Sequence, residues 1–287
     1  MLTIVQRSGG LRGKPPISRA VRGYSSRLPW VWDGLCFAVP FTDATQDAAR
    51  DIVVNAAPST VSGLGWTRDN RGNVAAAMGI SSYLSYPDNP AHNAPAAAVT
   101  VYVRVRRASQ SYEESSGLLT KRYAAVAPWL SWGIITDVAN GPYAAHMTVA
   151  GDWWYWVDTY TPNLTDWLSV VLRWRSGEAP VLMVFGERGD LKSSAVNPYP
   201  LTGAISYASG LPITFNATER DDLNYWADYS QGMVWSRYLT DAELQALVED
   251  PFGWYSPRRS TVGSSSPYPL VFGGGEMRGI GGMGGMY

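Results

Sequence analysis

The chain has 287 residues and is nearly neutral, with 23 lysine and arginine side chains against 24 aspartate and glutamate side chains. This balance indicates no strongly charged partner, and a single cysteine, Cys36, excludes a domain held together by intrachain disulfides. No apolar run reaches the length of a membrane span, and the first ten residues, MLTIVQRSGG, lack the apolar run of a signal peptide. We therefore expect a protein made in the cytoplasm that acts there or leaves by lysis or within a particle, with no membrane partner.

Residues 1–29 form a polar, basic arm without an acidic side chain. Its basic residues are Arg7, Arg12, Lys14, Arg19, Arg22 and Arg27. A solvated start of the chain is one interpretation, and contact with nucleic acid is a weaker one, because Tyr24 is the only aromatic residue that could stack on a base. We favour an arm that docks on an acidic surface of a partner protein, chiefly through Arg12, Lys14, Arg19 and Arg22.

Residues 30–255 carry nearly all of the periodic apolar pattern and are expected to form one domain. In AVTVYVRVRR, residues 98–107, valines alternate with Thr100, Tyr102, Arg104 and Arg106, which predicts a strand with one buried face. DWLSVVLRWRSG and APVLMVFGERGDL predict further strands, with a hairpin turn at Gly186–Gly189. GIITDV, YAAHMTVAG and PITFNAT predict shorter strands.

The segment GDWWYWVDTY, residues 151–160, contains four consecutive aromatic residues: Trp153, Trp154, Tyr155 and Trp156. In a strand, alternate residues face opposite sides, so one pair enters the core. The other pair either stacks on a sugar or packs against loops or a neighbouring chain, and we favour packing. A sugar site would require an exposed Trp154 or Trp156 beside a polar group such as Asp152 or Asp158.

One helix is expected over residues 240–249. Thr240 and Glu243 have the spacing of a capping box, and Leu239 and Leu244 that of a hydrophobic staple. Pro251 follows the helix and prevents its continuation. Many short strands with a single late helix predict an all-β, antiparallel sandwich.

Residues 256–287 form a tail that ends in VFGGGEMRGIGGMGGMY. This composition of glycine and methionine predicts a disordered or docking extension.

The segment GMVWSRYLTDAELQALVEDPFGWYSP resembles the end of laminin-G-like, concanavalin A-like jelly-roll domains, and is most similar to those of bacteriophage structural proteins. The matching residues are Trp235, Arg237, Leu239, Thr240, Glu243, Leu247, Asp250, Pro251 and Phe252. The resemblance covers about residues 33–254 and implies a jelly roll of two antiparallel sheets. It transfers no calcium or glycan ligand to a residue of this chain.

Sequence patterns for catalysis are weak. Retaining glycosidases require two carboxylates on one face across the bond, but Glu113 and Glu114 are adjacent and would face opposite sides of a strand. With only His92, His146 and Cys36 as nitrogen or sulfur ligands, no zinc spacing occurs. We therefore expect no enzyme, no metal and no cofactor.

The resemblance implies a bacteriophage virion protein. The first hypothesis is a capsid-surface decoration protein anchored by both extensions, present in many copies or as a homo-oligomer, with the major capsid protein as its partner. The second is a tail-associated module that binds a host glycan through Trp153, Trp154 and Trp156. The third is a glycan hydrolase.

Overall fold

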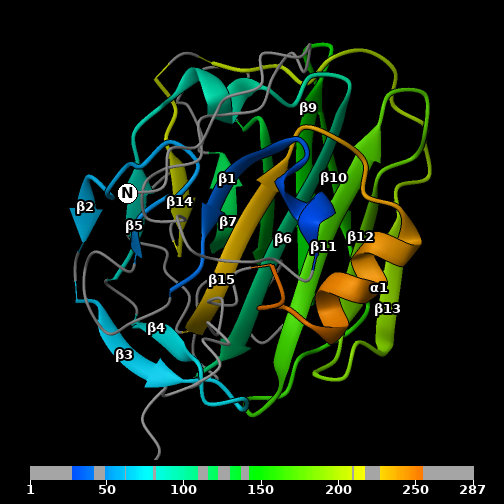
Figure 1. Ribbon diagram of the computed structural model, residues 1–287. Coiled ribbons are helices and arrows are strands. Elements are labelled where there is room, and N and C mark those ends of the chain that lie inside the picture. The colour runs from blue at the N-terminus through cyan, green and yellow to red at the C-terminus, as the bar shows by residue number, and fades with distance from the viewer. Residues whose placement is uncertain are drawn as a thin grey trace, which may run out of the picture. The chain divides into compact units, whose positions relative to one another are not determined.

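Two antiparallel β-sheets pack face to face in this protein (Figure 1). The computed structural model describes residues 28–41, 49–61, 63–79, 82–108, 116–121, 130–136, 142–208, 210–216 and 227–254. The chain divides into two units, residues 1–257 and 258–287, and every described residue lies in the first. The all-β antiparallel sandwich with one short helix, predicted from the sequence, is confirmed.

The larger sheet has eight strands. Its order is β13-β12-β11-β6-β15-β4-β3, and β1 pairs with β15 beside β4. The strands are β1 (Leu35–Val39), β3 (Gly65–Arg68), β4 (Val74–Met78), β6 (Ala98–Arg107), β11 (Trp167–Arg175), β12 (Val181–Phe185), β13 (Leu191–Val196) and β15 (Ala227–Trp235). In Figure 1, β15, β6, β11 and β12 run side by side across the front of the view.

The smaller sheet has seven strands in the order β10-β9-β8-β7-β14-β5-β2. They are β2 (Thr60–Val61), β5 (Leu84–Tyr86), β7 (Gly117–Lys121), β8 (Trp132–Thr136), β9 (Tyr143–Val149), β10 (Asp152–Val157) and β14 (Ile213–Phe215). Two 3-10 turns, η2 (Pro29–Trp32) and η4 (Pro90–Asn93), and the helix α1 (Asp241–Glu249) complete the described elements.

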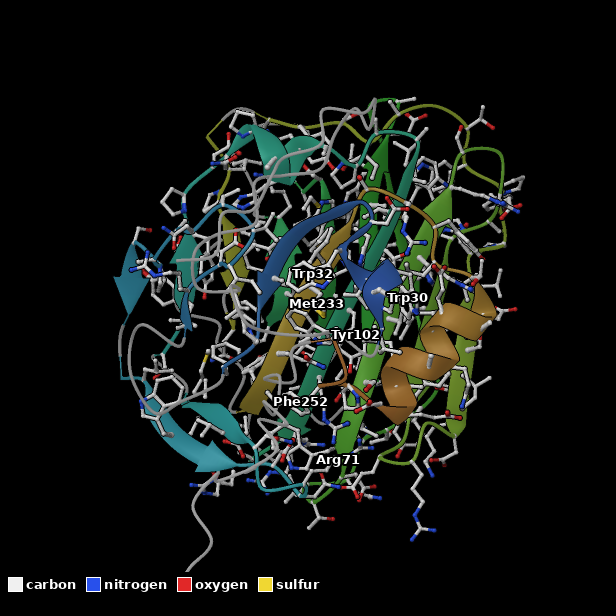
Figure 2. All side chains as sticks on the ribbon, viewed as in Figure 1. Trp30, Trp32, Arg71, Tyr102, Met233 and Phe252 are labelled. Atoms are coloured by element: carbon white, nitrogen blue, oxygen red, sulfur yellow. The ribbon has the colours of Figure 1, made fainter. Side chains whose placement is uncertain are left out.

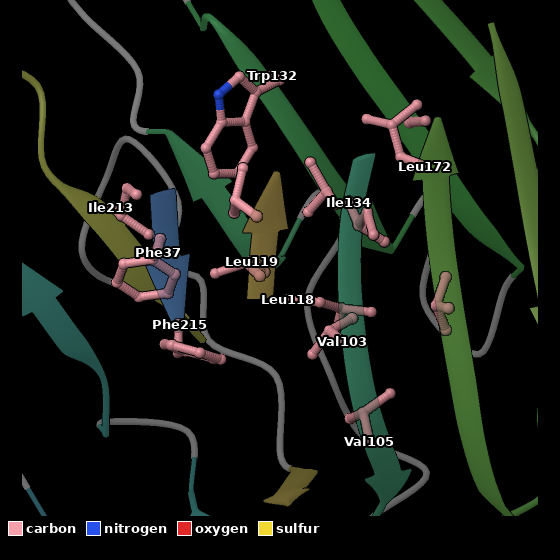
Figure 3. Close-up of a cluster of buried hydrophobic side chains, with 14 of the residues drawn as sticks. Phe37, Val103, Val105, Leu118, Leu119, Trp132, Ile134, Leu172, Ile213 and Phe215 are labelled. Carbon is pink, nitrogen blue, oxygen red and sulfur yellow. The ribbon is translucent and has the colours of Figure 1, made fainter. Parts of the chain in front are cut away.

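The main core lies between the sheets and is formed by inward-facing apolar residues of both (Figure 3). Val103 and Val105 of β6 and Leu172 of β11 face Leu119 and Ile134 of the smaller sheet across this interior. Cys36 lies in the same core, 3% exposed, and its thiol donates to the Val234 carbonyl oxygen at 3.2 Å. Cys36 is therefore a small buried residue of the core.

The prediction that the strand over 98–107 has only one buried face is wrong. Thr100, Tyr102 and Arg104 are fully buried on its second face. A second apolar cluster covers this face: it contains Tyr102 and Met233 of the sheet, residues of α1, and the partly buried tryptophans of η2. Figure 2 shows the side chains of Trp30, Trp32, Tyr102 and Met233 over β15 and β6, beside α1. The larger sheet is thus covered on both faces.

The helix begins as expected from its local sequence. The Thr240 hydroxyl accepts from the Glu243 amide at 3.3 Å, and the Glu243 carboxylate accepts from the Thr240 amide at 2.8 Å, which forms the predicted capping box. Leu239 and Leu244 are both buried in the second cluster, as a hydrophobic staple requires. These contacts place α1 on the outer face of the larger sheet.

Candidate ligand-binding site

The four consecutive aromatic residues lie on β10, which is an edge strand of the smaller sheet and pairs, among the described strands, only with β9. Trp154 and Trp156 face the interior: Trp156 is 6% exposed within the core, and Trp154 packs against it. Trp153 and Tyr155 face outward and are 47% and 36% exposed. A sugar site would have required an exposed Trp154 or Trp156, but the strand places Trp156 in the core and leaves Trp154 only partly exposed, so the exposed pair is Trp153 and Tyr155.

A two-residue turn fixes the partner of these outward side chains. Ala150 and Gly151 both have positive φ angles, 53° and 89°, which suit a tight hairpin between right-handed twisted strands. The resulting register places Tyr155 opposite His146 of β9. Residues directly opposite in an antiparallel pair share a face, so His146 also faces outward.

His146, Trp153 and Tyr155 form what we call the outer aromatic cluster. The Trp153 and Tyr155 rings are nearly parallel, with an interplanar angle of 7° and centroids 6.1 Å apart. The His146 ring stands edge-on to both, with centroid distances of 5.1 Å to Trp153 and 4.6 Å to Tyr155. The cluster therefore presents two parallel aromatic rings to solvent above a buried imidazole.

The imidazole is neutral at pH 7. His146 is only 7% exposed, and burial lowers its pKa to about 4. Within the described part of the chain, neither of its ring nitrogens has a hydrogen-bond partner. Two polar atoms that no described residue satisfies thus lie next to the exposed rings.

Away from β9 and β10, other side chains cover the outward face of the smaller sheet. The strand register continues from His146 to Gly133 of β8 and then to Thr120 of β7 and Thr214 of β14. A Cβ atom at Gly133 would lie 3.2 Å from Leu130 Cδ2, so this side chain lies over the glycine. Thr120 and Thr214 are buried, with their hydroxyl groups 2.8 Å apart. The exposed part of the site is therefore limited to β9 and β10.

The two acidic residues that the sequence places near the aromatics differ in role. Asp152 is exposed at the start of β10. Asp158 is buried; it accepts from the Ser193 hydroxyl at 2.6 Å and from the Tyr160 amide at 3.0 Å. Asp158 therefore links β10 to β13 of the other sheet, whereas Asp152 is free to face solvent.

The residues of the closing motif have structural contacts. The Trp235 indole donates to the Val31 carbonyl at 2.7 Å. The Arg237 guanidinium donates to the carbonyl oxygens of Asp33 and Trp30 and to the Glu243 carboxylate. The remaining buried members of the motif are Leu239, Leu247 and Pro251. The motif thus joins α1 to the beginning of the domain.

The six basic residues predicted to dock on a partner, Arg7, Arg12, Lys14, Arg19, Arg22 and Arg27, lie outside the described residues, as do Glu113, Glu114 and the tail. Within the described ranges, no group of three or more His, Cys, Asp or Glu side chains could hold a metal ion. No helix in that part of the chain is long and apolar enough to cross a membrane.

His92, the other histidine, is far from this cluster in sequence and has a structural environment. Its Nε2 lies 2.8 Å from Asp51 Oδ2, and both side chains are fully buried. The other oxygen of Asp51 accepts from the Ala38 and Val53 amides. The pair fixes residues 51–53 against β1 and has no exposure to a substrate.

Solved structures share the fold. Neither a protein-family model nor a curated protein matches the chain. The binding domain of Paraclostridial Mosquitocidal Protein 1 matches 77% of this chain at 16% identity with a TM-score of 0.57, and is itself covered over 55% of its length. The binding domain of botulinum neurotoxin serotype G matches 75% at 12% identity with a TM-score of 0.54, and is covered over 50%.

A sialidase of Trypanosoma rangeli matches 76% of the chain at 13% identity with a TM-score of 0.51, and only 33% of the sialidase is covered. The chain therefore spans about half or less of the length of these proteins. At such low identity the likeness shows the β-sandwich fold alone, a fold that carries unrelated functions.

Proposed function

We propose that this domain is a non-catalytic carbohydrate-binding module, with the outer aromatic cluster as its site. The observation that carries this proposal is the pair of parallel, outward-facing rings of Trp153 and Tyr155 on an edge strand. The apolar face of a sugar ring packs on aromatic rings, while its hydroxyl groups seek polar partners at the border of the site. His146, opposite Tyr155 on the same hairpin, supplies the polar groups.

The two exposed rings are of residue types that suit ligand contact. Trp and Tyr offer large apolar surfaces with few rotatable bonds, so fixing them against a ligand costs little conformational entropy. Removal of such a residue from the centre of a binding site commonly costs about 2 kcal/mol, which corresponds to roughly a thirtyfold loss of affinity.

The test is a glycan array followed by calorimetry on the best-bound glycan. We expect Trp153→Ala and Tyr155→Ala to lose about thirtyfold in affinity each. Tyr199→Ala is the matched control, since Tyr199 is also an exposed aromatic residue but lies outside the cluster. Absence of binding to any glycan, or equal losses in all three variants, would overturn the proposal.

A second candidate function is protein docking at one rim of the sandwich. All exposed large hydrophobic residues of the described ranges lie on β10, on β13 or just after β13: Trp153, Tyr155, Leu191, Val196 and Tyr199. β10 is a terminal strand of the smaller sheet and β13 is a terminal strand of the larger sheet. The hydrogen bond between Asp158 and Ser193 joins these two edges. Edge strands with exposed apolar side chains tend to pair with other chains.

Light scattering after size-exclusion chromatography distinguishes this candidate. A dimer or larger species that dissociates in Leu191→Lys or Tyr199→Ala, with glycan binding unchanged, would support docking at the rim. A monomer at all concentrations would refute self-association through these strands.

The capsid-decoration role remains a proposal that depends on the resemblance and on the basic arm. None of the three structures named above is described as a virion protein. Two experiments address it: immunogold labelling of purified virions, and deletion of residues 2–29 followed by a particle-binding assay. Unchanged particle binding after the deletion would contradict anchoring by the arm.

A further inference from the structure

We infer that the outer aromatic cluster recognises the uncharged end of a glycan, one or two sugar units long, and not the interior of a chain or an acidic sugar. This inference rests on the proposed function, since it specifies the ligand of the same site. It follows from three observations: the limited length of the exposed surface, the charges around it, and the unpartnered imidazole beneath it.

The exposed surface is short. The centroids of Trp153 and Tyr155 are 6.1 Å apart, which is comparable with one sugar ring and its linkage. Beyond His146, the face is closed by Leu130 over Gly133 and by the buried hydroxyl of Thr120. On the other side, β10 is the last strand of its sheet. A longer chain would leave the aromatic surface on either side and would gain no further contacts with these strands.

The charge around the site disfavours acidic sugars. Strands β8, β9 and β10 contain no lysine or arginine, and the exposed carboxylate of Asp152 begins β10. His146 is neutral at pH 7 because burial lowers its pKa to about 4. A sialic or uronic acid would therefore meet a like charge and find no cation on these strands.

The buried imidazole suits a hydroxyl group. A neutral histidine has one donor and one acceptor nitrogen, and a sugar hydroxyl both donates and accepts. Both nitrogens of His146 are covered and have no hydrogen-bond partner among the residues that the structure describes. Rotation of Trp153 or Tyr155, each of which is more than a third exposed, would open them to a hydroxyl at the end of a sugar.

Calorimetry with two series of sugars tests this inference on the full chain. The first series is galactose, lactose, lacto-N-tetraose and 3′-sialyllactose; the second is glucose, cellobiose and cellotetraose. For the series that binds, we expect the affinity to rise up to the disaccharide and then to change by less than about twofold, because no aromatic surface continues past the cluster. Sialylation should lower the affinity at least fivefold at low salt.

Asp152→Asn and Asp152→Lys test the charge argument. Asp152 is exposed, so both variants should fold, and both should bind the sialylated sugar more tightly than the natural chain does while binding the neutral sugar equally well. Affinity that increases with every added sugar unit, or tighter binding of the sialylated sugar by the natural chain, would overturn the inference and leave the proposed function intact. Failure of every sugar to bind would instead refute the proposed function, and the inference with it.

Discussion

Substitution of Gly232 by alanine should destabilise the sandwich, although alanine normally suits a strand better than glycine does. Gly232 lies within β15, the strand between β6 and β1. A Cβ atom there would lie 2.3 Å from Phe215 Cζ and 2.5 Å from Phe215 Cε1. Carbon atoms in contact are normally about 3.5–4.0 Å apart, so the clash exceeds an ångström.

The Phe215 ring cannot move away easily, because four rings surround it. The ring centroids of Phe37, Phe41, Tyr86 and Tyr229 lie 6.0, 5.6, 6.1 and 5.7 Å from its own. Overpacking of a core costs about 1–3 kcal/mol, and the close contact places this site at the upper end. The better strand propensity of alanine offsets about 1 kcal/mol. We expect a net loss of about 2 kcal/mol, or a decrease in Tm of roughly 4–8 °C.

Urea unfolding followed by tryptophan fluorescence measures this loss. Gly65→Ala is the matched control: it is also in a strand, and its added Cβ atom would meet Ala77 at an ordinary 3.5 Å. We expect Gly65→Ala to be neutral or slightly stabilising. Phe215→Leu should partly rescue Gly232→Ala, so that the double variant loses less than the sum of the two single losses. Equal midpoints for the two alanine variants would refute the reasoning.

Three further predictions concern the helix cap and the buried histidine. Thr240→Ala should cost about 1 kcal/mol of unfolding free energy, whereas Thr240→Ser, which keeps the hydroxyl, should cost at most a few tenths in the same urea assay. Burial raises the pKa of Glu243, but the hydrogen bonds and charge of Arg237 and the hydrogen bonds of Thr240 outweigh this effect, so the pKa lies below its usual value. The stability that the Glu243 carboxylate contributes is therefore present above its unfolded-state pKa and is lost as the pH falls through its folded-state pKa. Glu243→Gln should reduce this loss of stability at acid pH in thermal melts measured at a series of pH values. Folding lowers the pKa of His146 from 6.5 to about 4, so between pH 6.5 and pH 4 the unfolded chain binds a proton at this imidazole that the folded chain does not bind. The contribution of His146 should therefore decrease the free energy of unfolding by about 3 kcal/mol from pH 6.5 to pH 4, and His146→Phe should abolish this contribution. An unchanged pH dependence in the variant would show that the imidazole is accessible to solvent.

The helix and most strands could be predicted because their signals are local. The capping box of Thr240 and Glu243 is complete within four residues, so the observed helix agrees with the expected one. Alternation likewise predicted the strand over residues 98–107. Its second buried face could not be predicted, since α1, which covers it, lies more than 130 residues further along the chain.

The candidate site was only partly visible in the sequence. The run of aromatics showed that two of them must face away from the core, but alternation alone does not decide which two. The partner, His146, could have been found from the Ala150-Gly151 turn: a two-residue hairpin fixes the register, which places residue 146 opposite residue 155. The turn was not recognised in the sequence because alanine occupies position 150, where a two-residue hairpin usually has asparagine or aspartate.

The place of β15 in the larger sheet has a consequence for the order of events during synthesis. β15 is the last described strand in sequence, yet it joins β6 on one side to β4 and β1 on the other. Until residues 227–235 have left the ribosome, β1 has no partner among the described strands and the larger sheet remains in separate parts. Pairing across nearly 200 residues also carries a large loop-closure cost, which slows folding. The first described strand is therefore among the last to be paired, and we expect the larger sheet to form only after β15 has been synthesised.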